Sequence, residues 1–298
     1  DIVHLHSVFL WPTWAAARVA CAADIPYILS PRGMLVKELV HRKSRLLKTT
    51  WLKIIEKRNI ERAARLHVTS SAEALALDDF DFRLPPVSTI PNGVNAPEGI
   101  TRDEVSDDVA CVIDGDPFVL YFGRINWKKG LDRLIHAWCD VPEWRLVIAG
   151  NDEEQYLSKL FTLARKSGVD DRIHFLHRTI LGSDKEALMQ SASLLVLPSY
   201  SENFGNVILE SMIRGVPVVV TEEVGVKDVV KEAKGGLVVP ADKLGVSINE
   251  LLSDIERRIE MGKRGKDWVS ENLTWDKVAS EMVTVYQGIL DSEPMHNA

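Results

Sequence analysis

Residues 194–210 read LLVLPSYSENFGNVILE, and this stretch decides the fold of the chain. Its opening apolar run is typical of a strand that is buried on both faces of a parallel sheet. A helix is predicted over residues 206–213, because the stop signals Gly215 and Pro217 follow it. Residues 216–220 are apolar again and predict the next strand. In open α/β sheets, ligands bind at the loops that follow the strands, and a helix that begins there offers free N–H groups to a phosphate.

Two carboxylates of this stretch, Glu202 and Glu210, are eight residues apart. On a continuous helix, eight residues rise about 12 Å. That separation exceeds the roughly 5–9.5 Å between the paired carboxylates of glycosidases, although a curled loop at Glu202 would shorten it. The spacing suits two carboxylates that hold opposite ends of a nucleotide sugar across its pyrophosphate. The alternative is an ordinary capped helix with Glu210 in a surface salt bridge.

A basic turn, GRINWKKG at residues 123–130, follows another apolar run, which predicts a strand over residues 118–122. Gly123 would let a ligand approach the backbone. Arg124 can bind a phosphate with two parallel hydrogen bonds, and Lys129 adds a point charge. The turn is not the G-x-G-x-x-G fingerprint, and the acidic residue expected about 20 residues further on is absent. A solvated basic turn is the alternative to a phosphate site.

Strand and helix patterns alternate along the chain, which predicts parallel sheets and an α/β fold. Further strands are predicted over residues 2–6, 25–29, 66–69, 87–94, 145–149, 173–176 and 237–239. Helices are predicted over residues 13–23, 44–65, 71–77, 131–139, 153–167, 184–192, 226–234, 243–272 and 275–290, with Ser71 as a cap. Residues 95–116 lose the pattern, so we expect the linker there. The predicted domains are residues 1–108 and 109–274, with a helix over residues 275–298 that packs back toward the first domain.

The composition excludes several classes of protein. A length of 298 residues suits two domains. The net charge of −7 disfavours a nucleic-acid binder. The three cysteines are far apart, which argues for a reducing compartment and against a zinc site or a disulfide framework. No run approaches the roughly 18 apolar residues of a membrane span. We therefore expect a cytoplasmic protein with no metal site and no nucleic-acid partner.

One segment departs from this acidic balance. Residues 37–65 carry ten Lys or Arg against three acids, a net charge of +7. The simplest interpretation is an ordinary helix that packs on the sheet and keeps its charged side chains in water. Its apolar face would consist of Leu47, Trp51, Ile54 and Ile55. The alternative is a surface for an anionic membrane, where each Lys or Arg adds on the order of 1 kcal/mol. We expect peripheral attachment at the inner face of the membrane as the functional interpretation.

The motifs at residues 123–130 and 198–210, in this order and spacing, resemble family 4 of the retaining glycosyltransferases. The segments DIVHLH at residues 1–6, SPRGML at 30–35 and IPNGV at 90–94 look like the N-terminal domain of that family. The resemblance covers nearly the whole chain and implies the GT-B fold, with two Rossmann-like domains whose parallel sheets face each other across a cleft. It also implies an incomplete N-terminal domain, because the family's usual first strand and Gly-rich loop have no counterpart here.

The resemblance implies transfer of a sugar from a nucleotide diphosphate sugar, with retention and without a metal or other cofactor. Arg124 and Lys129 would hold the diphosphate, and Glu210 the ribose hydroxyls. Glu202 and the backbone amides of residues 204–205 would hold the donor sugar. The resemblance also implies that the leaving phosphate takes the acceptor's proton itself. The cations and the helix N-terminus would stabilise the charge that grows on the pyrophosphate.

Two side chains of the N-terminal half lie at predicted strand ends and would point toward the cleft. His6 could contact the donor sugar or the acceptor, and Arg32 could bind an acidic group of the acceptor. A histidine at a strand end that only bonds to the backbone is the alternative. We expect catalytic roles for Glu202, Arg124, Lys129 and His6. We expect substrate binding by Gly123, Arg32, Arg178, Asn203, Phe204, Gly205, Asn206 and Glu210.

The combined expectation is a retaining hexosyltransferase that builds a surface polysaccharide or glycolipid on a glycan or lipid-linked acceptor. Two rivals stay open. A nucleotide-sugar epimerase on the same fold would need acid and base residues and no separate acceptor. A non-catalytic fragment would bind the nucleotide sugar without turnover. Asn203, where the family more often has glycine, bears only on donor preference.

Overall fold

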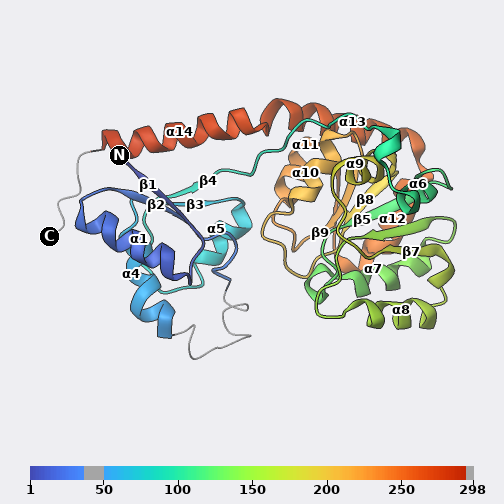
Figure 1. The fold of residues 1–298 in the computed structure, drawn as a ribbon, viewed down its shortest axis with the longest axis horizontal. Helices are drawn as coiled ribbons and strands as arrows, with labels where there is room; N and C mark the ends of the chain where they lie inside the picture. The colour runs from blue at the N-terminus through green and yellow to red at the C-terminus, as the bar shows by residue number, and fades with distance from the viewer. Residues whose placement is uncertain (37–49, 293–298) are drawn as a thin grey trace. The chain divides into compact units, whose positions relative to one another are not determined.

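The computed structural model describes residues 1–36 and 50–292, and the chain divides into two compact units. Unit 1 combines residues 1–92 with the helix that begins at Trp275, and unit 2 spans Gly93–Thr274. Each unit is a parallel sheet with helices packed on it, as the sequence predicts (Figure 1). Each unit also has a hydrophobic core of its own.

In unit 1 the strands follow one another in the order β1-β2-β3-β4. Every neighbouring pair is parallel, and His6 at the end of β1 is in register with Ser30 at the end of β2. The strands are β1 (Val3–His6), β2 (Tyr27–Ser30), β3 (Arg65–Val68) and β4 (Val87–Thr89). All four residues of β2 are buried, as expected for an inner strand of a parallel sheet.

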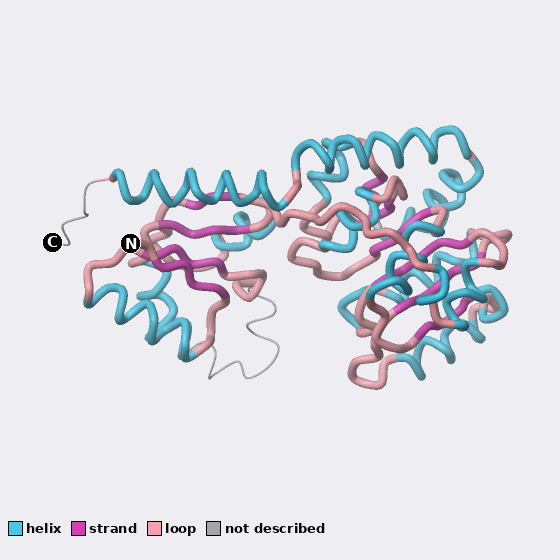
Figure 2. The backbone as a smooth tube through the Cα atoms, turned by 45° about the horizontal axis from the view of Figure 1, so that its top comes forward, coloured by secondary structure: helices cyan, strands magenta, loops and turns pink. Residues whose placement is uncertain are grey.

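Helices cover both faces of this sheet. Helix α14 (Trp275–Asp291) runs along one face, while α1 (Trp11–Ala22) and α4 (Lys57–Glu61) cover the other (Figures 1 and 2). Helix α5 (Ser71–Leu77) packs on β3 and β4. A π-helical turn, Leu52–Glu56, precedes α4. Because the returning α14 supplies one face, the sheet of unit 1 is completed by a segment from the other end of the described chain.

Unit 2 has a wider sheet in the order β10-β9-β8-β5-β6-β7. The chain moves outward from β5 through β6 to β7, then returns to the other side of β5 as β8. The strand order therefore reverses between the neighbouring strands β5 and β8. The carboxyl ends of these two strands form the switch point, where open α/β sheets bind their ligands. The strands are β5 (Phe118–Phe122), β6 (Arg145–Ala149), β7 (Ile173–Leu176), β8 (Leu194–Leu197), β9 (Val218–Thr221) and β10 (Gly236–Val239).

The helices of unit 2 begin just after the strand ends or pack against one another on the sheet. They are α6 (Asp107–Ile113), α7 (Leu131–Ala137), α8 (Leu157–Lys166), α9 (Gly182–Ser191), α10 (Asn206–Ile213), α11 (Lys227–Ala233), α12 (Leu244–Ser253) and α13 (Ile255–Asn272). Helix α10 packs on α13, and α7 packs on both α8 and α12. In the described chain, no helix is both long and apolar enough to span a bilayer.

The expected linker is partly wrong. Within residues 95–116, helix α6 forms and packs on α9 with Val109 and Val112 buried. The backbone N–H of Val94 donates to the carbonyl of Leu273 at 2.9 Å, which fastens the start of this segment to unit 2. The structure therefore divides after Asn92, whereas the expected first domain extends to residue 108.

Two smaller predictions also need correction. Ser70, not Ser71, caps α5, because its side chain accepts a hydrogen bond from the N–H of Glu73 at 3.1 Å. The predicted helix over residues 44–65 ends at Glu61, and Arg65 already belongs to β3; residues 44–49, with Leu47, lie outside the described part. In the described part Ile54 is 63% exposed while Leu52 is buried, because the π-helical turn rotates the apolar face.

Candidate functional site

The loops that follow β5 and β8 meet at the switch point of the unit 2 sheet. The N–H of Tyr200 donates to the carbonyl of Lys128 at 2.8 Å and ties the two loops together. Gly130 begins α7 in the left-handed region with φ +64, and a Cβ there would lie 2.0 Å from the carbonyl oxygen of Pro198. Only glycine allows this close approach, so the sequence motif and the loop packing have one cause.

The loop after β8 is fastened on its other side to the loop after β9. The carbonyl of Glu202 accepts from the N–H of Gly225 at 2.9 Å, and the carbonyl of Phe204 accepts from Val226 at 2.9 Å. Phe204 is buried. Gly205, with φ +95, turns the chain into α10, which has no side-chain N-cap and starts at Asn206. Asn203 lies within this loop. Backbone hydrogen bonds to the loop after β9 therefore fix the start of α10 at the edge of the sheet.

Lys129 and Glu202 form an ion pair across the two loops. Their side chains are only 15% and 18% exposed. The structure therefore brings together two of the expected catalytic residues, although they are far apart in the sequence. A cation that is largely shielded from water interacts more strongly with an anion than an exposed one does. The pair places one cation and one carboxylate at the switch point, in the loops that follow β5 and β8.

Arg124 lies on the same turn but has a different partner. Its guanidinium is 64% exposed and lies 3.3 Å from a carboxylate oxygen of Glu153. Asn126 donates to Glu153 at 3.0 Å, and this hydrogen bond, aided by Arg124, lowers the pKa of the Glu153 carboxyl despite slight burial. Gly123 follows β5 with φ +152, and its carbonyl oxygen would lie 1.9 Å from a Cβ at Gly150. The two neighbouring strand ends therefore pack closely beneath Arg124.

Glu210 faces α9 rather than Glu202. A carboxylate oxygen of Glu210 lies 2.8 Å from the ammonium of Lys185, and both side chains are 26% exposed. Glu202 lies in a loop and only residues from Asn206 onward are helical, so the separation of about 12 Å estimated for a continuous helix does not apply. Lys185 was not expected from the sequence, since a lysine on a predicted helix carries no sign of its partner. It gives Glu210 a fixed orientation.

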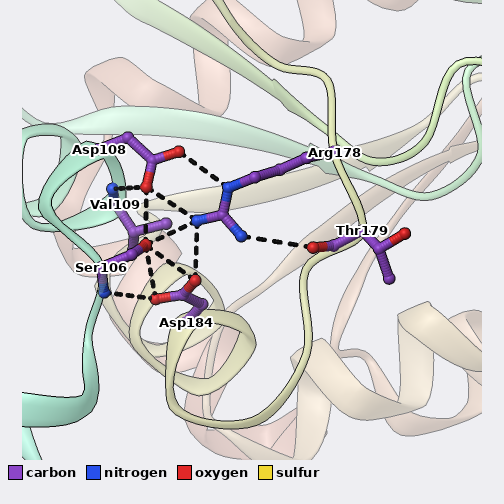
Figure 3. A network of polar contacts seen from close by, with 6 residues as sticks. All are labelled: Ser106, Asp108, Val109, Arg178, Thr179 and Asp184. Atoms are coloured by element: carbon purple, nitrogen blue, oxygen red, sulfur yellow. Dashed lines mark hydrogen bonds and ion pairs between the residues drawn. The ribbon is translucent and has the colours of Figure 1, made fainter.

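Arg178 is the centre of a network within unit 2. Figure 3 shows its guanidinium between the carboxylates of Asp108 on α6 and Asp184 on α9. Its Nη2 lies 2.8 Å from Asp108 and 2.7 Å from Asp184, and it also donates to Ser106 at 2.6 Å. The hydrogen bond from Arg178 lowers the pKa of the Asp108 carboxyl, and the same bond raises the pKa of the guanidinium. The predicted role of Arg178 in substrate binding stays a prediction.

In unit 1, the side chains of His6 and Arg32 contact each other at the strand ends. Their predicted roles toward donor and acceptor stay predictions. The Nε and Nη2 of Arg32 each lie 3.3 Å from Nδ1 of His6, and Nη1 donates to the side-chain oxygen of Asn92 at 3.0 Å. Burial, and secondly the charge of Arg32, lower the pKa of His6. Asn92 was not expected to contact either residue.

Beneath them a row of polar side chains crosses the sheet. Tyr286 on α14 lies 2.7 Å from Nδ1 of His4, and Nε2 of His4 lies 2.7 Å from the hydroxyl of Ser30. That hydroxyl lies 2.8 Å from Nδ1 of His67, whose Nε2 lies 3.0 Å from the carbonyl of Ile90. Burial is the main cause that lowers the pKa of His4, to about 3, and that of His67.

This row has one direction. A carbonyl only accepts, so Nε2 of His67 carries the proton and its Nδ1 accepts from Ser30. The Ser30 oxygen then accepts from Nε2–H of His4, and Nδ1 of His4 accepts from the hydroxyl of Tyr286. The row therefore links α14 through three strands to the end of the fourth, with both histidines neutral.

Neither unit groups ligands for a metal in its described residues: no three His, Cys, Asp or Glu side chains come together there in a suitable cluster. The chemistry that the described site offers comes from fixed cations, carboxylates and backbone N–H groups at strand ends. Such groups bind phosphates and hydroxyls.

Family comparisons match both units. The family description "Glycosyl transferases group 1" matches residues 107–268, and "Glycosyl transferase 4-like domain" matches residues 1–93. An uncharacterized glycosyltransferase of Methanocaldococcus jannaschii is 34% identical over 183 residues, which are 59% of this chain and 46% of the relative. A D-inositol 3-phosphate glycosyltransferase of Xylanimonas cellulosilytica is 29% identical over 218 residues, 70% of this chain and 49% of the relative. The chain spans about half the length of these curated relatives.

A third relative is a GDP-mannose-dependent alpha-(1-6)-phosphatidylinositol monomannoside mannosyltransferase of Mycobacterium tuberculosis. It is 30% identical over 217 residues, 64% of this chain and 55% of the relative. Among solved structures, HepE of Anabaena in complex with UDP and glucose is similar with a TM-score of 0.79 at 19% identity, over 97% of this chain and 78% of that one. Sucrose-phosphate synthase of Thermosynechococcus elongatus gives 0.76 at 23% identity, over 98% and 74%. These likenesses confirm the GT-B fold of two Rossmann-like units.

Proposed function

Because the chain belongs to the group 1 glycosyl transferases, we propose that it moves a hexose-type sugar from a nucleotide diphosphate sugar to a glycan or lipid-linked acceptor. The transfer retains the configuration at the sugar's C1 and needs no metal. It serves the synthesis of a surface polysaccharide or glycolipid.

The observation that carries this proposal is the Lys129–Glu202 ion pair at the switch point. A diphosphate that enters there meets the ammonium of Lys129 and the N–H groups that begin α10 at Asn206. Glu202 then gives up its hold on Lys129 and is available to accept hydrogen bonds from the sugar hydroxyls. One pair of side chains thus suits both the charged and the neutral part of a sugar nucleotide.

The reaction is electrostatic in this proposal. The bond between the sugar's C1 and the diphosphate oxygen breaks, while the acceptor oxygen forms a bond to C1 on the same face. The acceptor's hydroxyl proton passes to the departing phosphate oxygen. Lys129, exposed Arg124 and the N-terminus of α10 stabilise the negative charge that grows on that phosphate, which lowers the barrier.

The rest of the donor is held further along the same sheet edge. Glu210, oriented by Lys185 at 2.8 Å, accepts hydrogen bonds from the two ribose hydroxyls. The loop after β7, with Arg178, borders the base. The relatives' names include GDP-mannose and the solved neighbours include a complex with UDP, so both bases belong in the test.

The acceptor lies with unit 1 in this proposal, at His6 and Arg32. The described part of the basic segment, with Lys53 and Arg58 exposed, would hold unit 1 on an anionic membrane from the cytoplasmic side. Sedimentation with vesicles checks this part: equal binding to anionic and neutral lipid would remove it. Residues 37–49 of the segment lie outside the described part.

Incubation of the chain with labelled nucleotide sugars, with and without a lipid-linked or glycan acceptor, tests the proposal. Transfer to acceptor with retained configuration supports it. Isomerised donor without acceptor would indicate an epimerase instead. Donor binding without any turnover would indicate a binding module. Calorimetry against UDP, GDP and ADP sugars identifies the base first and limits the number of donors to label.

A further inference from the structure

We propose that Arg32, His6 and Asn92 form a binding site for a phosphate group that the acceptor carries. The inference rests on the proposed function, because it names the chemical class of the acceptor for that reaction. The inference goes beyond the proposed function in two respects. It names the acceptor group that is recognised, and it states that His6 takes up a proton when that group binds.

The three side chains come from different strand ends of unit 1. His6 is the last residue of β1, Arg32 follows the end of β2, and Asn92 follows β4. The carboxyl ends of parallel strands share one edge of the sheet, and this is the edge at which α/β sheets bind ligands. His6 is exposed and Arg32 is half-buried, so a ligand can reach both side chains.

Arg32 lacks the carboxylate partner that several other arginines of the described chain have. The arginines that pair with a carboxylate are Arg102, Arg124, Arg133, Arg178, Arg214 and Arg264. Within residues 1–36 and 50–292, Arg32 has no carboxylate within ion-pair distance, and its partners are the uncharged acceptors of His6 and Asn92. Its positive charge is therefore not neutralised by the described part of the chain.

The backbone holds Arg32 in a fixed position. Arg32 has φ +55 and Gly33 φ +71, so two successive residues are left-handed. The N–H of Gly33 donates to the buried carboxylate of Glu73, which also accepts from the N–H and the hydroxyl of Thr69 at 2.8 and 3.0 Å. A non-glycine residue in this conformation is uncommon and persists where the surroundings determine it. The anchored turn keeps the guanidinium at the sheet edge.

His6 occupies the fork that a phosphate would take. Both Nε and Nη2 of Arg32 point at the single nitrogen Nδ1 of His6, at 3.3 Å each. Since a guanidinium only donates, Nδ1 is unprotonated and Nε2 carries the ring proton. A phosphate oxygen pair is the better acceptor for this fork, because its charge and its geometry both match. Its arrival frees Nδ1 of His6 to take a proton.

Charge balance selects phosphate over carboxylate. A phosphate monoester carries about −1.5 to −2 charges near pH 7, and Arg32 supplies one positive charge. Among the described residues, the titratable or charged groups that face His6 are Arg32, the stacked His4, and His67 on β3. Beyond His67, Glu73 on α5 adds a negative charge. A dianion beside His6 raises its pKa and draws in a proton, while a carboxylate is already balanced by Arg32.

The test follows the His6 ring by NMR in the 298-residue chain, as a function of pH, at constant ionic strength. The probes are inorganic phosphate, glycerol 3-phosphate and acetate. With either phosphate we expect the His6 pKa to rise by about one unit. Acetate should give a much smaller rise. No change with phosphate would overturn the site, and an equal rise with acetate would overturn the phosphate assignment.

Three arginine variants show whether Arg32 causes the phosphate-induced rise in the pKa of His6. In Arg32→Gln, the phosphate-induced rise should disappear and phosphate affinity should fall at least tenfold. Arg18→Gln, which removes an exposed arginine on α1, should behave like the unchanged chain. Arg32→Lys keeps the charge but loses the fork, so it should bind phosphate more weakly with part of the rise retained. Persistence of the full rise in Arg32→Gln would contradict the proposal.

Nucleotide binding separates this inference from the proposed function. Arg32→Gln should bind a nucleoside diphosphate like the unchanged chain, because that site is in unit 2. If the unchanged chain bound no nucleotide, the proposed function would fail whatever His6 reports. If it bound nucleotide while phosphate left His6 unchanged, only the phosphate site would fail.

Discussion

The ammonium of Lys185 on α9 lies 2.8 Å from the carboxylate of Glu210 on α10. Both side chains are about three-quarters buried, so the pair holds Glu210 in one orientation at the edge of the unit 2 sheet. The carboxylate that is expected to bind the ribose is therefore positioned by a neighbouring helix before any ligand arrives. Preorganisation of this kind lowers the entropy that binding costs.

This pair makes a first prediction. Glu210→Gln should weaken nucleoside diphosphate binding about tenfold, which corresponds to the roughly 1.4 kcal/mol that a charge-assisted hydrogen bond contributes. Lys185→Met should weaken it less, since Glu210 stays but loses its fixed orientation. Calorimetry measures both variants, with Lys159→Met on the surface of α8 as the matched control. If Lys185→Met lost more affinity than Glu210→Gln, Lys185 itself would contact the ligand.

Substitution of Lys129 and substitution of Glu202 should change the affinity for a nucleoside diphosphate in opposite directions. Glu202→Gln removes the negative charge that competes for Lys129, so a nucleoside diphosphate without a sugar should bind several-fold tighter. The same variant should slow sugar transfer about a hundredfold, because the sugar loses its carboxylate partner. Lys129→Met should weaken diphosphate binding. Binding and single-turnover rates check these signs, and equal losses of affinity in both variants would contradict the division of roles.

A comparison of two glycines distinguishes the cost of backbone strain from the cost of a steric clash. Gly130 and Gly168 have φ of +64 and +67, but a Cβ would meet the Pro198 carbonyl only at Gly130. Gly168→Ala should lower the free energy of unfolding by about 1–2 kcal/mol, the cost of the left-handed conformation. Gly130→Ala should lower it by about 3 kcal/mol or more, because the β5 and β8 loops must also separate. Chemical denaturation measures the difference, and similar costs would show that the loops yield easily.

Unit 1 should lose stability in mild acid. The pKa of His4 is about 3 in the folded chain against about 6.5 when unfolded, so the unfolded chain binds more protons between these values. The stability contributed by neutral His4 is complete above pH 6.5 and is lost as the pH falls toward 3. Burial lowers the pKa of His67 as well, which acts in the same direction.

Denaturation midpoints between pH 7 and pH 5 measure this loss. His4→Phe should be less stable at pH 7, because two hydrogen bonds disappear, but its stability should change less with pH. A steeper dependence in His4→Phe would show that His4 is not the group that titrates.

Arg178 has two possible roles that one comparison separates. Asp108→Asn weakens the network in Figure 3 on the side of α6 without altering Arg178 itself. It should lower the stability of unit 2 and leave nucleotide affinity unchanged. Arg178→Gln should lower both, if the loop after β7 borders the base as proposed. Unchanged nucleotide affinity in Arg178→Gln would leave Arg178 with a structural role alone.

The strands of unit 2 could be read from the sequence because parallel strands that are buried on both faces are continuous apolar runs. The loops after β5 and β8 were predictable for the same reason, since each begins where such a run ends at Gly123 or Pro198. Helix α6 was missed because Val109 and Val112 are separated by few residues and surrounded by acids. A short amphipathic helix in an acidic segment resembles a linker until its partner helix is known.

Side-chain partners were the least predictable part of the site. Glu202 and Glu210 were identified, but Lys185 and Glu153 were not, because pairing across helices and loops leaves no periodic signal in the chain. His4 and His67 lie on predicted strands, but the sequence indicates no partner for either side chain. Their connection through Ser30 to Tyr286 depends on the return of α14. That return was predicted, but no local pattern shows which side chains it brings into contact.

That return sets an order of events during synthesis. His4 and Tyr286 are 282 residues apart in the chain, so at about 5–20 residues per second the ribosome needs roughly 15–55 s to supply the second after the first. Unit 2 is contiguous and can close on itself within that interval. The strands of unit 1 emerge earlier but stay uncovered on one face until α14 appears. During synthesis this sheet face therefore stays open until α14 has emerged, and it is where chaperones would be needed.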